Sequence, residues 1–176
     1  MNYTDPVNSH TKTGKWMLAI SWIIVLVILT MIFGKWEYNQ INPNQNLHSS
    51  ANENDVIEVL LLQNKWGHYV FNGKINGKTV EFLLDTGASE VSIPGNLAQD
   101  LNLVSGAPLN RYTANGRIEV YASSVSSLEI GDIHLSDVFA TINPNMKQGQ
   151  ILLGMSALKQ VEFIQRDGTL ILKQYR

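Results

Sequence analysis

The sequence predicts a mostly β domain with a few short helices, preceded by one membrane-spanning helix. Two observations carry this prediction. An uncharged apolar run extends from Trp16 to Phe33, and from Val56 onward short apolar runs are broken by Asn-Gly, Gly-Asp and Asp-Gly pairs. An apolar segment of about 18 residues is just long enough to cross a bilayer core. Apolar runs separated by such pairs are typical of consecutive β-hairpins.

The composition limits the chemistry available to the chain. The 176 residues include no cysteine, which excludes disulfides and thiolate chemistry. The formal net charge is −2, without a basic run that would attract nucleic acid. The four histidines lack the spacing of metal ligands, so we expect no metal and no other cofactor. Carboxylates and hydroxyls remain as the candidate reactive groups.

Residues 1–15 are expected to form a cytoplasmic tail, and residues 16–33 a retained transmembrane anchor. Two lysines precede the apolar run, whereas Lys35 after it is offset by Glu37, so the positive-inside rule favours a cytoplasmic N-terminus. A cleaved signal peptide is the alternative, but the run is long for one and no small-residue cleavage site follows Gly34. We therefore expect a single-pass protein of the inner (plasma) membrane with an extracytoplasmic domain, periplasmic in a Gram-negative cell.

The segment 34–54 is expected to be a flexible stalk, because it is rich in Asn, Gln and Ser and has neither helical nor strand periodicity. The β domain is expected to occupy residues 55–176. Its predicted elements, in chain order, are strands at 56–62, 69–75 and 78–84, a short helix at 96–101, a hairpin at 112–120, strands at 123–130, 134–142 and 151–154, a helix at 156–160 and a closing hairpin about Asp167-Gly168.

The strand predicted at 78–84 leads directly into Asp85-Thr86-Gly87. Three such residues occur together by chance, and a carboxylate that caps a turn at a strand end is the alternative interpretation. The context favours chemistry, since the small residues Ala88 and Ser89 follow, and the apolar segment Leu152-Leu153-Gly154 lies about 65 residues downstream.

Five short motifs together resemble those of the bacterial membrane-anchored retropepsin-like aspartic proteases. They are Gly67-His68-Tyr69, Ile75-Asn76-Gly77, Asp85-Thr86-Gly87-Ala88, Thr113-Ala114-Asn115-Gly116 and Leu152-Leu153-Gly154-Met155-Ser156. The resemblance spans nearly everything after the stalk. It implies an all-β, retropepsin-like half-barrel, with Asp85 as the catalytic acid and a polypeptide as the substrate. It also implies that Asn115 and Gly116 form the tip of a flap over a cleft, although Asn-Gly on its own indicates a plain hairpin turn.

The chemistry of peptide hydrolysis explains why one such aspartate is insufficient. Without a metal or a nucleophile, one carboxylate must activate water and one carboxylic acid must protonate the carbonyl oxygen. Two aspartates that share a proton supply both groups. The sequence contains one Asp-Thr-Gly and no internal repeat, so we expect the second carboxylate from Asp85 of another copy in a homodimer. Thr86 is expected to brace the two loops, and Gly87 to permit their close approach.

Two positions depart from the family pattern. Ala88 stands where pepsin-like enzymes carry a serine that supports the ionised carboxylate, and Ser89 stands where retroviral enzymes usually carry an aspartate that holds the substrate backbone. We expect both, with Asn115 and Gly116, to line the substrate site. The alternative function is a catalytically silent membrane-anchored β domain that binds peptides or dimerises, and the intact Asp85 argues against it. A purely structural envelope protein would have no cleft.

Overall fold

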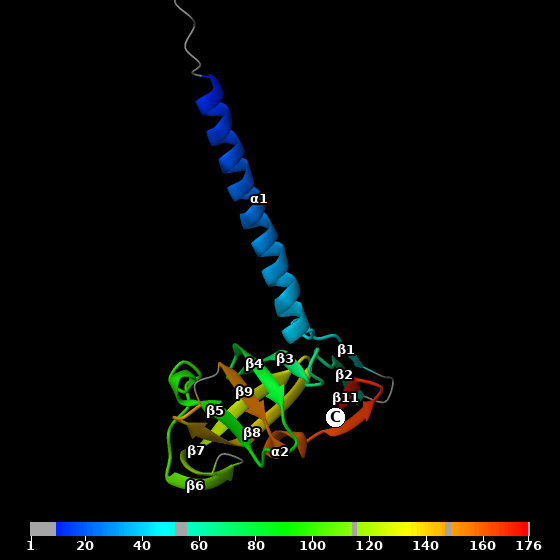
Figure 1. The fold of residues 1–176 in the computed structure, drawn as a ribbon. Coiled ribbons are helices and arrows are strands. Elements are labelled where there is room, and N and C mark those ends of the chain that lie inside the picture. Colours follow the sequence, from blue (N-terminus) through cyan, green and yellow to red (C-terminus); the bar gives the residue numbers. More distant parts are fainter. Residues whose placement is uncertain (1–9, 52–55, 114–115, 147–148, 176) are drawn as a thin grey trace, which may run out of the picture. The chain divides into compact units, whose positions relative to one another are not determined.

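The computed structural model describes residues 10–51, 56–113, 116–146 and 149–175. The chain divides into two compact units, Met1–Asn39 and Gln40–Arg176. Apart from one long N-terminal helix, the described residues are mostly strands (Figure 1), which confirms the fold class predicted from the sequence.

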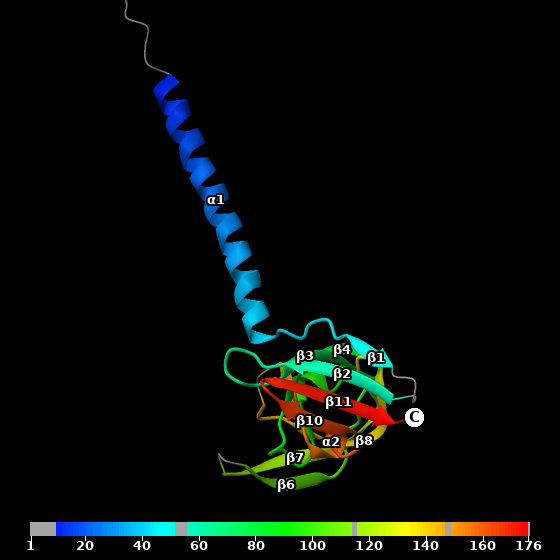
Figure 2. The same cartoon turned by 90° about the vertical axis from the view of Figure 1, so that its right-hand side faces the viewer.

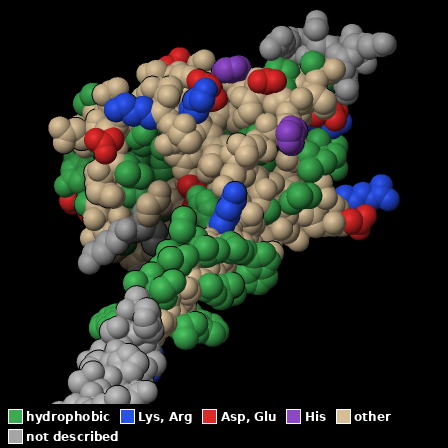
Figure 3. All heavy atoms as spheres, turned by 90° about the horizontal axis from the view of Figure 1, so that it is seen from above, with side chains coloured by type: hydrophobic (Ala, Val, Ile, Leu, Met, Phe, Trp, Pro, Cys, Tyr) green, Lys and Arg blue, Asp and Glu red, His purple; other side chains and the backbone are tan. Residues whose placement is uncertain are grey.

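The described part of the first unit belongs to helix α1 (His10–Ile41), which continues two residues into the second unit. The segment Gly14–Ile41 is long and apolar enough to cross a membrane, a property that a signal sequence shares. Figure 3 shows hydrophobic side chains clustered along this helix. The helix extends through residues 35–41, which were expected to belong to a structureless stalk. Propagation of an existing helix is cooperative, so a few polar residues of moderate propensity do not end it.

The second unit forms two β-sheets. Its elements are β1 (Ser49–Ala51), β2 (Val56–Leu62), β3 (Val70–Ile75), β4 (Lys78–Leu84), β5 (Val91–Pro94), the 3₁₀ turn η1 (Gly95–Leu97), β6 (Pro108–Thr113), β7 (Gly116–Ile130), β8 (Ile133–Asn143), β9 (Gln150–Leu153), the short helix α2 (Met155–Leu158), β10 (Glu162–Arg166) and β11 (Thr169–Tyr175). In place of the helix expected at 96–101 the chain forms the shorter turn η1. The second strand of the hairpin expected at 112–120 and the strand expected at 123–130 form one continuous strand, β7.

The larger sheet has the order β3-β4-β9-β5-β8-β7-β6. Strand β3 also pairs with β7, so part of this sheet closes on itself like a barrel. The pairs β4–β9 and β5–β8 are parallel, and the remaining pairs are antiparallel. The smaller sheet has the order β1-β2-β11-β10, with β10 at an edge (Figure 2). All five residues of β10 are exposed.

The core is formed by the inward faces of both sheets. Alternate residues of β3 are buried, including Phe71 and Ile75, and the ring of Phe71 stacks on Phe82 of β4 with centroids 5.4 Å apart. The turn between these strands is Asn76-Gly77, with φ of 49° and 79°. Both values lie in the left-handed region that a two-residue hairpin turn requires. The period-2 pattern and the turn pair therefore produce this hairpin as the sequence predicted.

The segment after α1 contacts the β domain, in contrast to the flexible stalk expected there. Asn44 is 5% exposed, and its side-chain amide donates to the carbonyl oxygens of Leu62 and Val70, both at 2.8 Å, while its oxygen accepts from Leu62 N–H at 2.8 Å. Asn42 is fully buried and donates to Asn72 and Glu81. Asparagine carries both donor and acceptor groups, so it can replace a backbone partner between two strands.

Candidate active site

Asp85 lies at the point where β4 ends. Strand β4 pairs in parallel with β9, with Leu84 opposite Leu153, and the N–H of Asp85 donates to the carbonyl oxygen of Leu153 at 3.1 Å. Two adjacent parallel strands therefore hold the start of the loop Asp85–Ala88, called the Asp85 loop below.

The Asp85 loop is a tight turn that orients the carboxylate. The N–H of Gly87 donates to Oδ1 of Asp85 at 2.9 Å, and the N–H of Ala88 donates to the main-chain oxygen of Asp85 at 3.2 Å. Asp85 is half-buried, whereas Thr86 and Gly87 are exposed. A Cβ at Gly87 would lie 3.2 Å from Oδ1 of Asp85, so a larger residue there would crowd the carboxylate.

The segment after β9 supports the Asp85 loop from behind. The N–H of Met155 donates to the carbonyl oxygen of Ala88 at 2.8 Å. A Cβ at Gly154 would lie 2.7 Å from that same oxygen and nearer still to the carbonyl oxygen of Glu90, so only glycine fits without displacing the backbone. The hydroxyl of Ser156 accepts from the N–H of Val91 at 2.9 Å.

A cleft of about 370 Å³ opens beside Asp85. It brings together four of the predicted site residues, namely Asp85, Gly87, Ala88 and Ser89. Other lining residues come from the β6–β7 hairpin, and they are Arg111, Tyr112, Thr113, Ile118 and Val120. The cleft thus lies between the Asp85 loop and this hairpin.

Two of the predicted site residues that the structure describes, Thr86 and Gly116, do not line the cleft. Thr86 is exposed beside it, and Gly116 is exposed at the start of β7, where its φ of +102° suits glycine. Asn115 lies outside the described residues. Thr113 and Gly116 are paired across the hairpin, and the Thr113 hydroxyl donates to the Gly116 carbonyl oxygen at 3.0 Å.

A family comparison identifies the kind of protein that carries this site. The family described as gag-polyprotein putative aspartyl protease matches residues 71–160, a range that contains Asp85, the β6–β7 hairpin and Gly154. The chain belongs to this aspartyl protease family. The matched range begins inside β3 and ends after α2, so it includes every described residue that lines the cleft.

Two relatives of this aspartyl protease family member are themselves uncharacterized proteins. One, from the cobV 5′ region of Sinorhizobium sp, is 34% identical over 112 residues, which are 61% of this chain and 48% of the relative. The chain therefore matches about half the length of that relative. The other, from Rickettsia prowazekii (strain Madrid E), is 27% identical over 172 residues, which are 90% of this chain and 70% of the relative.

A solved structure shows the same fold. The crystal structure of a retropepsin-like aspartic protease from Rickettsia conorii superposes with a TM-score of 0.55 at 24% sequence identity. The match covers 73% of this chain and 95% of the Rickettsia conorii chain. The retropepsin-like architecture that the sequence motifs implied is thereby confirmed.

Sequence reasoning missed two charged residues in the cleft of this aspartyl protease family member. Glu90 follows Ser89 directly, and Nε of Arg111 donates to Oε1 of Glu90 at 2.5 Å. The two residues are 21 positions apart and lie on different elements, so no periodic pattern brings them together. The only local signal was the position of Glu90 beside the Asp-Thr-Gly motif.

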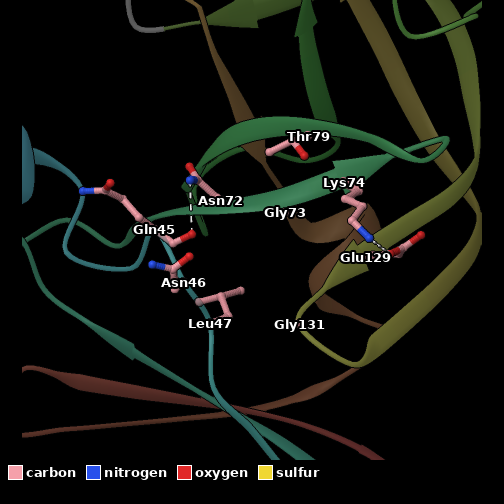
Figure 4. A pocket seen from close by; sticks show the side chains of 9 residues that line it. All are labelled: Gln45, Asn46, Leu47, Asn72, Gly73, Lys74, Thr79, Glu129 and Gly131. Carbon is pink, nitrogen blue, oxygen red and sulfur yellow. Dashed lines mark hydrogen bonds and ion pairs between the residues drawn. The ribbon is translucent and has the colours of Figure 1, made fainter.

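A second cavity, of about 450 Å³, shares no lining residue with the cleft (Figure 4). One side is formed by the segment Gln45–Leu47, and Asn72 donates to the carbonyl oxygen of Gln45 at 3.2 Å. Among its described lining residues the one carboxylate, Glu129, is paired with Lys74 at 3.1 Å. A single paired carboxylate is not an acid–base couple, so the cleft beside Asp85 remains the candidate active site.

Proposed function

We propose that the protein is an aspartic endopeptidase in which Asp85 residues of two chains form the catalytic pair. The observation that carries the proposal is the position of Asp85 at a strand end, in a cleft beneath a β-hairpin, in a chain of the aspartyl protease family. A polypeptide held extended between the Asp85 loop and the hairpin would be the substrate, with Ala88, Ser89, Asn115 and Gly116 as its contacts.

The proposed reaction uses one proton shared by the two carboxyl groups. The ionised carboxylate accepts a proton from a water molecule as its oxygen attacks the peptide carbonyl carbon, and the protonated carboxyl donates its proton to the carbonyl oxygen. The tetrahedral gem-diol then breaks its C–N bond. The carboxyl group that took the proton from water donates it to the leaving amine nitrogen, and the other carboxylate takes a proton from a gem-diol hydroxyl, which restores one shared proton. The Gly87 N–H at 2.9 Å holds Asp85 in one orientation throughout.

The carboxylates in the cleft support the proposal of a second chain. Among the described residues that line the cleft, Glu90 is the other carboxylate, and one of its oxygens accepts from Arg111. Asp132, Asp137 and Asp167 are exposed and do not line the cleft. The exposure of Thr86 and Gly87 in a single chain also supports the proposal, since these residues would meet their counterparts at the two-fold axis.

The remaining parts of the proposal concern the anchor. Helix α1 would retain the protein in the inner membrane as a single span, with residues 1–15 cytoplasmic and the protease domain periplasmic. Anchoring would confine the chains to a plane and raise the effective concentration at which they meet.

The test is cleavage of a peptide library by the full-length protein in detergent, beside its Asp85→Asn variant. The substitution keeps the shape of the side chain and removes the acid–base group, so we expect a loss of several orders of magnitude in rate, with an unchanged circular dichroism spectrum. Undiminished cleavage by pure Asp85→Asn protein would refute the assignment. Peptide binding without products in the unmodified protein would favour the silent β domain.

A further inference from the structure

An ion pair joins the β6–β7 hairpin to the segment that follows the Asp85 loop. Arg111 lies in β6, Glu90 lies one residue before β5, and both line the cleft. We infer that this pair is a latch that holds the hairpin closed over the cleft, which makes Glu90 and Arg111 positioning residues. The inference rests on the proposed peptidase function.

The described residues near the end of the hairpin are mostly exposed. Strand β6 is at the edge of the larger sheet and, within the described residues, its ladder partner is β7 alone. Tyr112 is 84% exposed, and Thr113 and Arg117 are exposed as well. An edge hairpin with little buried apolar surface opens at low energetic cost, so a cross-link to the domain has a large influence on its position.

Glu90 provides a fixed point for such a cross-link. Its main-chain oxygen packs closely against Gly154, and the next residue, Val91, donates to the hydroxyl of Ser156. The Glu90 side chain is 12% exposed. The latch therefore connects a segment that hydrogen-bonds to α2 and packs against Gly154 to a hairpin at the edge of the larger sheet.

Arg111 also makes a hydrogen bond within the hairpin. Its Nη1 donates to the carbonyl oxygen of Asn110 at 3.3 Å, and Arg117 on the opposite strand donates to the Asn110 side chain at 3.0 Å. The Arg111 side chain is 36% exposed, whereas both side chains of the Arg166–Asp167 pair are almost fully exposed. The cleft pair is thus screened less by solvent than a surface pair, and it is correspondingly stronger.

Loss of the latch should affect substrate capture more than chemistry, because neither residue reacts with the peptide bond. We would measure KM and kcat for one uncharged peptide with full-length protein in detergent. The variants are Glu90→Gln, Arg111→Gln, the double variant, and Glu129→Gln, which breaks the Lys74 pair outside the cleft. Each single cleft variant should raise KM about threefold to tenfold, with kcat changed less than about twofold.

The double variant distinguishes a latch from two independent residues. If the pair acts as one unit, the double variant raises KM no more than either single variant. The KM of the unmodified protein should then depend on salt concentration, and this dependence should be absent in both single variants and in the double variant. Glu129→Gln should match the unmodified protein. If circular dichroism shows that Glu90→Gln does not fold, the latch is tested with Arg111→Gln alone, from its KM and the dependence of that KM on salt concentration.

Additive effects of the two substitutions, or an unchanged KM in Arg111→Gln, would overturn the latch. The Asp85→Asn variant separates this failure from that of the peptidase assignment. Cleavage that survives in Asp85→Asn means that the proposed function is wrong. Cleavage that is lost in Asp85→Asn while KM stays unchanged in the cleft variants means that only the latch is wrong.

Discussion

Replacement of Asn44 by alanine should destabilise the β domain strongly, although Asn44 lies in a segment whose composition resembles a linker. Asn44 makes three side-chain hydrogen bonds of 2.8 Å, two with Leu62 and one with the carbonyl oxygen of Val70. The Val70 bond is buried and the Leu62 bonds are partly buried. The substitution leaves all three backbone groups without these partners.

The magnitude follows from how accessible those groups are to water. A buried unsatisfied acceptor costs about 1–3 kcal/mol, and each partly buried bond contributes about 0.5–1.5 kcal/mol, so the loss is roughly 2–6 kcal/mol. For a domain of this size each kcal/mol lowers Tm by about 3–5 °C, which gives a fall of roughly 6–30 °C. Such a loss is a large part of the about 5–15 kcal/mol that typically holds a domain folded.

The assay is thermal and urea unfolding of the full-length protein in detergent, followed by circular dichroism at a wavelength dominated by β-structure. Asn46→Ala is the matched control, because Asn46 is an exposed asparagine two residues away. It should change the free energy of unfolding by less than about 0.5 kcal/mol. If Asn44→Ala unfolds at the same urea concentration as Asn46→Ala, the hydrogen bonds of Asn44 do not stabilise the domain.

Three further outcomes are expected. Gly154→Ala should lower both stability and cleavage, because its methyl group would lie 2.7 Å from the Ala88 carbonyl oxygen; a fully active, equally stable variant in a melting and cleavage assay would contradict this. Specific activity in excess detergent should fall on dilution, since one chain supplies half of the proposed site; a fully active monomer in sedimentation would refute the shared site. The pKa of the Tyr175 hydroxyl is raised chiefly because this hydroxyl donates to Glu162. Glu162→Gln should therefore move one tyrosine ionisation to lower pH in an ultraviolet titration, and an unchanged titration would exclude that contact in solution.

The features that could be predicted from the sequence are those that depend on neighbouring residues. The alternation in β3 and β4 and the Asn76-Gly77 turn define a hairpin because side chains repeat with period 2 and the turn needs positive φ. The position of Asp85 at the end of β4 follows from the same pattern. These local rules place the acid at a strand end before any tertiary contact is considered.

The features that could not be predicted depend on partners far apart in the chain. Asn44 bonds to residues 18 and 26 positions away, and the mostly polar composition of its segment gives no sign that it is buried. The pairing of Arg111 with Glu90 likewise requires the strand order of the larger sheet. Hydrophobic periodicity indicates which side chains are buried in a core. It does not indicate which polar side chains hydrogen-bond to backbone groups far away in the sequence.

The exposed edge strand β10 affects how any self-association of this protein should be interpreted. Within the described residues β10 pairs with β11 alone, and its Phe163 and Ile164 are 39% and 41% exposed. An open edge with apolar side chains is a template on which another chain can add a strand. Particles of twice the mass can therefore arise by edge pairing without any meeting of Asp85 loops. A lysine in place of Ile164 would disfavour such pairing. In Ile164→Lys protein, particle mass and the rate of peptide cleavage should therefore both be measured as a function of protein concentration and compared.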